Sequence, residues 1–293
     1  MKKLLLASTA VVMSAGVAAA DVSLSGDAWM GLTYNDTLVD EVQMISRARV
    51  TFTLSGETDH GMAFGGSFRA DNAGAASTGN AGSVFISGDF GKLSMGDVSS
   101  GLEATWFRTR HIGVLENAGG SRASTLTAGA TPAALYEYSI DGFKVAASVG
   151  QFASGAQSYG IGASYTMDGY GIAIGYERNA ASSTHILLSG QVNFDPVSVR
   201  AFVGRVSVDA ADAALALALG VAAGNDYDQY GADLHASFDE IGVQLRGKRD
   251  FAGNNHIGAG VTYSLGGGAT LGASVNRVSG GATTADVGLS FSF

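Results

Sequence analysis

The sequence predicts an all-β fold, a 16-stranded antiparallel transmembrane β-barrel with a long loop after the fifth strand. Three observations support this prediction. Most of the chain alternates with a period of two, short and long connections follow one another along it, and no segment after residue 20 is apolar for long enough to form a membrane-spanning helix. Because only helices and closed barrels satisfy every backbone hydrogen bond in lipid, strands with apolar outer faces favour a barrel.

The alternation divides the chain into sixteen predicted strands, mostly eight to sixteen residues long. They are residues 22–34, 43–58, 62–71, 81–89, 91–98, 133–140, 143–151, 157–167, 170–179, 183–194, 197–209, 226–239, 241–253, 255–266, 269–280 and 284–293. Bacterial outer-membrane barrels have an even number of strands, and the predicted number agrees with this.

The predicted short connections are rich in Asp and Gly, the residues that tight turns prefer. Asp141, Asp168 and Asp195 follow one another at intervals of 27 residues, and Asp239 and Gly266 are separated by the same interval. This spacing fits two strands of ~10 residues with one short and one longer connection, which is the hairpin of an outer-membrane barrel.

The two faces of the predicted strands differ in polarity. In residues 43–58 the apolar face carries Met44, Ala48, Val50, Phe52 and Leu54, and the polar face carries Gln43, Arg47, Arg49, Thr51, Thr53 and Ser55. A charged side chain that pointed into lipid at mid-depth would cost ~2–4 kcal/mol, so the polar faces are expected to surround water. A barrel of this strand number has room for an aqueous lumen, whereas one of about eight strands is filled by side chains.

The stretch MDGYGIAIGY, residues 167–176, is apolar on one face and almost without side chains on the other. The apolar face is expected to contact lipid, with Tyr170 and Tyr176 near the two interfaces, where aromatic rings are favoured. The opposite residues are expected to line the inner wall and keep the lumen open, and they are Gly171, Ala173 and Gly175.

Residues 1–20 have the plan of a cleaved signal peptide, which leaves residues 21–293 as one exported barrel. Lys2 and Lys3 precede an apolar run, and Ala18-Ala19-Ala20 provides an A-x-A cleavage site. Removal of the two lysines changes the formal net charge from −9 to −11, and such an acidic chain is a poor candidate for binding nucleic acid. The sequence has no cysteine, so no disulfide is expected.

The sequence carries no recognisable catalytic or metal-binding signature. It has no G-x-S-x-G, G-x-G-x-x-G, P-loop or H-E-x-x-H motif, and its five histidines have no ligand spacing. We therefore expect no enzymatic activity, no cofactor and no metal.

The longest predicted connection, residues 98–131, is expected to fold into the barrel as a constriction loop, because its aromatic and aliphatic residues would not stay solvated outside. The charged residues expected at the constriction are Arg47, Arg49, Arg69, Glu103, Arg108, Arg110 and Glu116. Other pore-lining residues, further round the wall, are predicted to be Lys144, Arg200, Arg246 and Lys248. The three strand arginines would face Glu103 and Glu116, and the resulting transverse field would orient dipolar solutes and sort ions.

A second long connection, residues 208–226, is predicted to contain a short helix of Ala and Leu. It would cover a pore mouth or pack on a loop of its own or of a neighbouring subunit.

Four stretches resemble the general diffusion porins of alphaproteobacteria, the Rhodobacter-type family. They are DVSLSGDAWMGLTY, SRARVTFTLSGETDHGMAFGGSFRA, GSVFISGDFGKLSMGD and the terminal ADVGLSFSF. The resemblance implies a homotrimer in the outer membrane, in contact with outer-membrane lipid and lipopolysaccharide. Each barrel would form a water-filled pore for passive diffusion of ions and small hydrophilic solutes. It also implies that the terminal Phe293 is read by the barrel-assembly machinery.

The predicted constriction loop departs from those porins in its charges. Residues 98–131 contain no Asp, two Glu and three Arg, which is too few carboxylates for a hard cation, so no calcium site is carried over. Two alternatives remain open from the sequence. One is a substrate-selective channel, for which Trp29 and Phe202 have inward phase, and the other is a non-conducting exported adhesin or surface protein.

Overall fold

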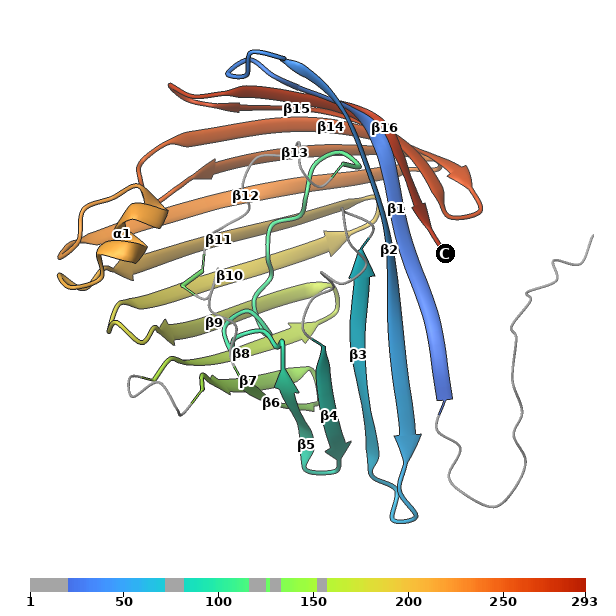
Figure 1. Ribbon diagram of the computed structural model, residues 1–293, viewed down its shortest axis with the longest axis vertical. Coiled ribbons are helices and arrows are strands. Elements are labelled where there is room, and N and C mark those ends of the chain that lie inside the picture. The colour runs from blue at the N-terminus through green and yellow to red at the C-terminus, as the bar shows by residue number, and fades with distance from the viewer. Residues whose placement is uncertain (1–20, 72–81, 116–124, 127–132, 152–156) are drawn as a thin grey trace, which may run out of the picture.

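The chain forms a closed barrel of sixteen antiparallel strands, each paired with its neighbours in sequence (Figure 1). The computed structural model describes residues 21–71, 82–115, 125–126, 133–151 and 157–293. The predicted signal peptide and Glu116 lie outside these residues. The prediction of a 16-stranded antiparallel barrel is confirmed.

The strands vary in length between the two sides of the barrel. They are β1 (Asp21–Asn35), β2 (Val42–Glu57), β3 (Ala63–Asp71), β4 (Ser83–Gly88), β5 (Gly91–Gly96), β6 (Ala134–Ile140), β7 (Phe143–Val149), β8 (Tyr159–Met167), β9 (Tyr170–Arg178), β10 (Thr184–Phe194), β11 (Val197–Ser207), β12 (Asp226–Phe238), β13 (Ile241–Arg249), β14 (Asn255–Gly266), β15 (Ala269–Val278) and β16 (Thr283–Ser292). One helix, α1 (Ala213–Leu219), lies between β11 and β12.

The barrel closes where the first and last strands meet. β1 pairs with β16 from Asp27↔Ser292 to Asn35↔Thr284. The terminal Phe293 extends this ladder, because its backbone N–H donates to the Gly26 carbonyl at 2.9 Å. No strand edge is therefore left open between β16 and β1, which is the condition for a sheet in lipid.

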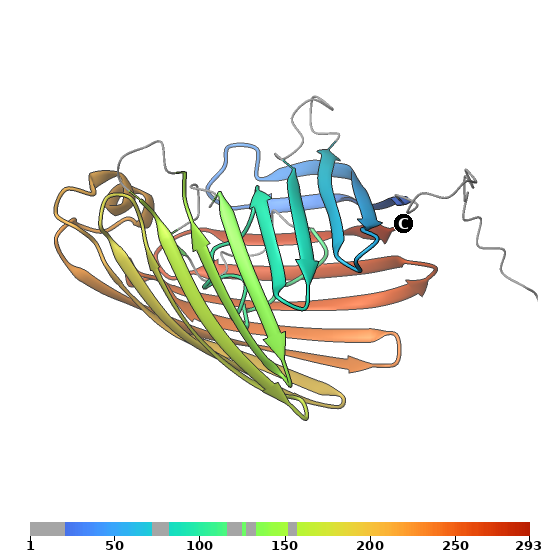
Figure 2. The same ribbon diagram turned by 90° about the horizontal axis from the view of Figure 1, so that it is seen from below.

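The short turns lie at one end of the barrel and the long connections at the other, beside α1 (Figure 2). Asp141, Asp168 and Asp239 begin three of the short turns with φ of 48°, 48° and 51°. Asp tolerates this left-handed region better than most residues, and tight hairpins require it. The 27-residue spacing of the turn aspartates is thus the length of one hairpin with its two connections.

The outer surface of the barrel is a band of large exposed apolar side chains. Ile172 and Ile174 of β9 are 57% and 52% exposed, and Tyr170 beside the short turn is 61% exposed. Aromatic rings also contact one another between neighbouring strands, with Phe143 and Tyr165 at 4.3 Å between ring centroids. Such a band is unfavourable in water and suits a lipid surround.

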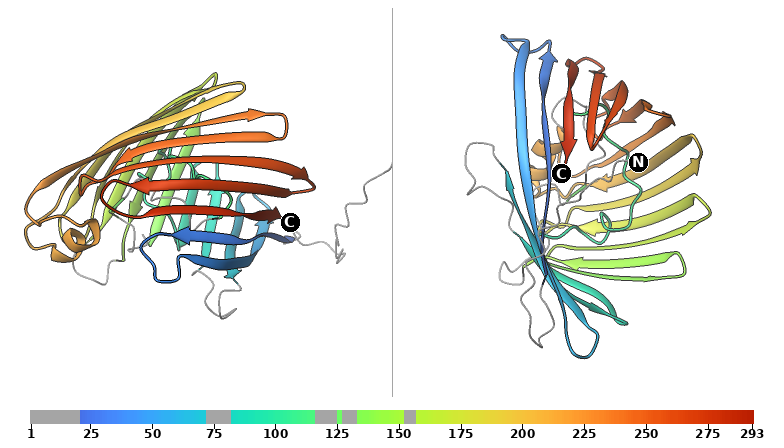
Figure 3. Two further views of the ribbon diagram at one scale, coloured as in Figure 1. Left: turned by 90° about the horizontal axis from the view of Figure 1, so that it is seen from above. Right: turned by 90° about the vertical axis from the view of Figure 1, so that its right-hand side faces the viewer.

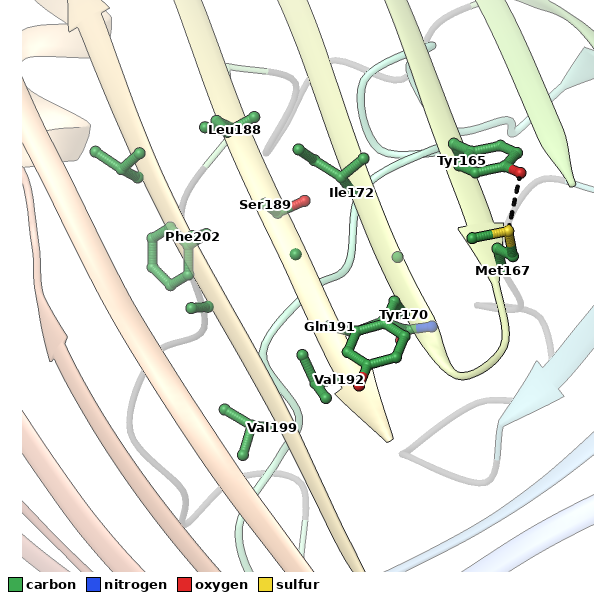
Figure 4. A pocket seen from close by; sticks show the side chains of 14 residues that line it. Tyr165, Met167, Tyr170, Ile172, Leu188, Ser189, Gln191, Val192, Val199 and Phe202 are labelled. Carbon is green, nitrogen blue, oxygen red and sulfur yellow. Dashed lines mark hydrogen bonds between the residues drawn. The ribbon is translucent and has the colours of Figure 1, made fainter. Parts of the chain in front are cut away.

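The outer surface has a hollow over β8 to β11, shown in Figure 4, which we call the outer groove. It has a volume of about 660 Å³. The groove exists because Gly190 and Ala201 carry little or no side chain between larger neighbours. Its lining side chains include Tyr165, Tyr170, Ile172, Leu188, Val192, Val199 and Val203.

Helix α1 packs on the end of β11 and on loops of its own chain. Ala216 of α1 belongs to a buried cluster with Val206, Val208, Phe251 and Leu126. Among the described residues no helix has both the length and the hydropathy to cross a membrane.

The carboxylate of Asp212 begins α1 and ties it to the connection between β9 and β10. It accepts the Leu215 backbone N–H at 3.1 Å, and it also accepts Asn179 Nδ2 and Ser183 Oγ, both at 2.7 Å. Burial raises the pKa of this carboxyl, but the three hydrogen bonds outweigh burial and leave the pKa below its usual value.

Replacing Asp212 with Ala should loosen α1, because an N-cap contributes about 1 kcal/mol and two further hydrogen bonds are lost. Hydrogen exchange of the amides of residues 213–219 should then be at least about fivefold faster. Because the folded-state pKa is lowered, the stabilisation by native Asp212 is present above the ordinary pKa of ~3.9 and is lost as pH falls through the folded value. Asp209→Ala is the control, since Asp209 Oδ1 accepts only the exposed Ala211 N–H in the described contacts. Equal exchange in both variants would contradict this role.

Candidate functional site

Residues 97–115, here called the inner loop, leave the wall after β5 and cross the space that the strands enclose (Figure 3). Three backbone amides of the loop donate to side chains on successive parts of the inner wall. Gly101 N–H reaches Ser148 Oγ of β7 at 2.9 Å, and Phe107 N–H reaches Ser189 Oγ of β10 at 3.0 Å. Gly113 N–H reaches Gln244 Oε1 of β13 at 2.7 Å. The inner loop therefore follows the wall from β7 round to β13.

The loop lies close to the wall because small residues make room for it. A Cβ atom at Gly175 would lie 2.5 Å from Cγ of Leu102, and one at Gly260 would lie 2.6 Å from Cγ2 of Ile112. At the far end of the loop, a Cβ at Gly288 would lie 2.7 Å from Cδ2 of Leu115. These positions exclude any larger residue unless the loop moves.

The prediction that the small residues of β9 keep the lumen open is therefore wrong. Gly171 and Gly175 do lie on the inner wall, but they do not border an open lumen. The space over Gly171 is filled by the ring of Phe107, and that over Gly175 by Leu102. They are small so that the inner loop can pack against β9.

Glu177 of β9 binds two parts of the connection between β5 and β6. Its Oε1 accepts Ser100 Oγ at 2.9 Å, and its Oε2 accepts the Leu126 backbone N–H at 3.0 Å. The Glu177 side chain has no solvent exposure. A buried carboxylate needs such hydrogen bonds, so Glu177 and its two donors hold one another in place.

Asp233 of β12 binds the middle of the inner loop through Arg110. Asp233 Oδ2 accepts the Arg110 backbone N–H at 2.7 Å, and Oδ1 accepts the guanidinium Nε at 2.9 Å. The same guanidinium donates from Nη1 to Ser198 Oγ at 2.9 Å. Asp233 is buried, whereas 22% of the Arg110 side chain remains exposed. Arg110 thus uses most of its donors to attach the loop to β11 and β12.

Two wall arginines that pair in register with Asp233, one on each neighbouring strand, also hold the loop backbone. Arg200 Nη1 donates to the Arg108 carbonyl at 3.0 Å, and Arg246 Nη1 donates to the Arg110 carbonyl at 3.3 Å. Arg246 and Lys248 were predicted to line the pore, but each is only 5% exposed. This part of the prediction is corrected, because both side chains are buried and Arg246 donates to the backbone of the inner loop.

The arginines of β2 and β3 form a network with two aspartates. Arg47 Nη2 lies 2.6 Å from Asp27 Oδ2. Arg49 contacts Asp71 at 3.0 Å and 3.2 Å, and Arg69 Nε lies 3.1 Å from Asp71 Oδ1. The described carboxylate partners of the three arginines are thus on neighbouring strands of the same wall, not on the inner loop.

The remaining predicted residues take separate positions. Glu103 Oε1 accepts Thr125 Oγ1 at 2.9 Å, and Lys144 Nζ lies 2.7 Å from Glu137 Oε1. The Arg108 guanidinium carbon lies 5.5 Å from the centre of the Trp106 ring. The part of the chain that the structure describes contains no cluster of His, Cys, Asp or Glu suited to a metal ion.

Sequence reasoning missed Asp27, Glu177 and Asp233. Asp27 shares the phase of Trp29 and pairs in register with Arg49, so its inward phase was a usable signal. Glu177 and Asp233 also have inward phase, but nothing in the sequence indicates which part of the loop lies against them.

Replacing Asp233 with Ala should destabilise the barrel, because Arg110 would remain partly buried without its carboxylate, a change that costs ~3–5 kcal/mol for a fully buried pair. A folded barrel migrates on a gel as a compact species until heating unfolds it. The temperature at which this unfolding occurs should be lower in the variant than in the parent. The double variant Asp233→Ala, Arg110→Ala should regain part of the loss, since no unpaired charge remains. A single variant as stable as the parent would show that this pair does not anchor the loop.

The geometry agrees with comparisons to known proteins. The sequence profile of the Gram-negative porin family matches residues 7–286. A porin from Rhodobacter capsulatus is 34% identical over 304 residues, which cover 93% of this chain and 100% of that protein. A solved structure of a porin, refined at 1.8 Å resolution, has a TM-score of 0.77 and 29% identity, with coverage of 93% and 100%. A mutant of the Rh. blastica porin shares the fold, with a TM-score of 0.74 and 21% identity over 93% and 100% of the two chains. The chain therefore belongs to the Gram-negative porin family, and it is an outer-membrane protein that forms a pore for diffusion.

Proposed function

We propose that this porin is a homotrimer whose barrels each form a water-filled pore for passive diffusion of ions and small hydrophilic solutes. We further propose that the inner loop narrows each pore. The observation that carries this proposal is the attachment of the loop inside the barrel, through Glu177 and Asp233. A loop held by two buried carboxylates keeps a fixed position in the lumen, as a constriction requires.

The constriction is proposed to be lined by Arg47, Arg49, Arg69, Glu103, Arg108, Arg110 and Glu116, together with Asp27 and Asp71. The arginine network on β1 to β3 supports this, because its charges lie on the inner wall and its guanidinium groups are held in fixed positions by the two aspartates. A fixed set of charges at a narrow point sorts ions by sign. Lys144 and Arg200 would add positive charge further round the lumen.

Residues 1–20 are proposed to be a signal peptide that is removed on export. The barrel-assembly machinery is proposed to read Phe293, whose side chain is 80% exposed at the end of β16. The outer surface would contact outer-membrane lipid and lipopolysaccharide. We propose no enzymatic activity and no cofactor for this chain.

The alternative of a substrate-selective channel rested on Trp29 and Phe202. Both have inward phase, but they are 6% and 5% exposed and pack against Leu115 and Leu102. Aromatic rings covered by the loop do not offer a track for a solute. General diffusion is therefore the better supported function.

Single-channel recording in a planar bilayer tests the proposed function. Purified protein should give current steps that close in thirds, with weak selectivity in a salt gradient. Folded protein that inserts without conducting would reject an open diffusion pore, and single steps without substates would reject the trimer.

Replacing Arg47, Arg49 and Arg69 with Gln should shift selectivity towards cations, because Asp27 and Asp71 would lose their compensating charges. The measurement is the reversal potential in a salt gradient. The matched variant Asp27→Asn, Asp71→Asn should shift it in the opposite direction. An unchanged reversal potential in both variants would show that this network does not set the field at the constriction.

A further inference from the structure

Four arginines recur at one position in alternate strands. Arg178, Arg205, Arg249 and Arg277 are each the ninth residue of their strand, in β9, β11, β13 and β15 respectively. We call them the arginine belt. Their strands all run from the short turns towards the long connections, so each arginine lies near the long-connection end.

The belt faces outward. Each arginine is an even number of residues from an exposed apolar residue of its own strand and so lies on the same, outer face. These apolar residues are Ile174 in β9, Val203 in β11, Leu245 in β13 and Val275 in β15, at 52%, 49%, 48% and 47% exposure. Inward positions of the same strands are occupied instead by residues that contact the inner loop or are buried, such as Glu177 and Arg246.

The four arginines also lie at one level around the barrel. Arg205 pairs in register with Asp228 of β12, whereas Arg249 pairs with Tyr230, two residues further along that strand. The same shift of two residues separates Arg249 from Arg277 across β14. Strands of a barrel are tilted and staggered, so a constant shift between alternate strands keeps residues at equal height.

Charge on the outer face is confined to this part of the barrel. In the described parts of β16 and of β1 to β8, no outward position carries a charged residue. On β9 to β15 the outward charged residues are the four arginines and two aspartates of β12, Asp226 and Asp228. An ordered set of cations on one arc of an otherwise apolar surface marks an interaction surface.

The depth of the belt fits the headgroup level of a membrane. A cation on the lipid face costs ~2–4 kcal/mol at the midplane but ~0–1 kcal/mol near the interface, so four outward arginines mark an interface. Below them the surface is apolar. At its end nearest the long connections, the outer groove is lined by Val203 and Leu188. These two residues pair with each other, two positions nearer the short turns than Arg205 and its partner Ile186. An apolar groove under a cation suits a lipid with an anionic headgroup and an acyl chain.

The contacts of the belt leave it accessible. Arg205 donates from Nε to Asp228 Oδ1 at 2.7 Å and from Nη2 to Asp228 Oδ2 at 2.8 Å, yet its side chain is 57% exposed. Arg178 Nη2 donates to Ser182 Oγ at 2.8 Å, and Arg249 Nη1 donates to Asn255 Oδ1 at 3.3 Å. These contacts use at most two of the three guanidinium nitrogens. A planar guanidinium is well suited to bind phosphate oxygens in pairs.

The long connections of outer-membrane barrels face the outside and the short turns face the periplasm, so the belt lies at the outer leaflet. We propose that the arginine belt binds the phosphate groups of lipopolysaccharide there, with acyl chains on the apolar surface and in the outer groove. The inference rests on the proposed contact with lipopolysaccharide and adds its residues and its chemistry. It also divides the barrel wall into a lipid-binding arc, β9 to β15, and an uncharged arc that is available to neighbouring subunits.

The test measures capture of purified bis-phosphorylated lipid A by the full barrel in detergent, using native mass spectrometry. The variant replaces Arg178, Arg205, Arg249 and Arg277 with Gln, and the matched control replaces the inward arginines of β2 and β3 in the same way. Loss of the phosphate contacts should weaken lipid A binding by at least about tenfold in the belt variant and not in the control. Dephosphorylated lipid A should bind the parent as weakly as lipid A binds the belt variant. Inorganic phosphate at matched concentration should not compete, because it lacks the acyl chains.

Single-channel current separates this proposal from the proposed pore. The belt variant should conduct like the parent, whereas the inward control should change selectivity. Equal capture of lipid A by parent and belt variant, or equal capture of dephosphorylated lipid A by the parent, would overturn the phosphate contact. Loss of the oligomer in the belt variant would also overturn it, because the arginines would then bind another subunit. If the variant with four substitutions does not insert into the membrane, the double variant Arg249→Gln, Arg277→Gln takes its place. It keeps the Arg205–Asp228 pair, and its loss of lipid A binding should be smaller.

Discussion

Every backbone N–H and C=O in the wall must find a partner within the protein, because lipid offers none. The pairing of β1 with β16 meets this condition, and the terminal Phe293 continues the pairing to the last residue of the chain. Closure then fixes which side chains face outward, since a shift of one residue in any strand would turn its apolar set inward. The positions of the inner loop, the arginine network and the arginine belt all depend on this register.

The closed wall encloses more space than its own side chains fill, and the inner loop uses that space. Folding a loop inward requires compensation, because its backbone groups leave water and its residues lose conformational freedom. Here the wall supplies acceptors at the points where the loop backbone needs them, such as Ser189 for Phe107 and Gln244 for Gly113. Glycines opposite Leu102 and Leu115 then allow close apolar contact. The inner wall is thus complementary in shape and in hydrogen bonding to the inner loop rather than to a solute.

The strands were predictable from the sequence because their signal is local. The alternation of Ile172 and Ile174 with glycine and alanine, and the spacing of Asp141 and Asp168, depend on neighbouring residues and on turn geometry. The site was less predictable because its contacts join distant parts of the chain. Phase alone places Asp233 inward, but only the path of the loop brings Arg110 to it. The sequence analysis did not single out Asp27 for the same reason, since the register of β1 against β2, not phase alone, brings it beside the arginines.

Net charge gives no guide to the field inside this pore. The chain is acidic, with a formal net charge of −9, and yet its inner wall and its outer belt carry most of its arginines. Some of the acidic residues lie in the short turns, where an aspartate is favoured in the left-handed region, as at Asp141, Asp168 and Asp239. Those carboxylates lie at the rim, where water and salt screen them. Arg47 and Arg49 of the inner wall are only 11% and 13% exposed, so water and salt screen their charges and those of their aspartate partners less than the charges at the rim.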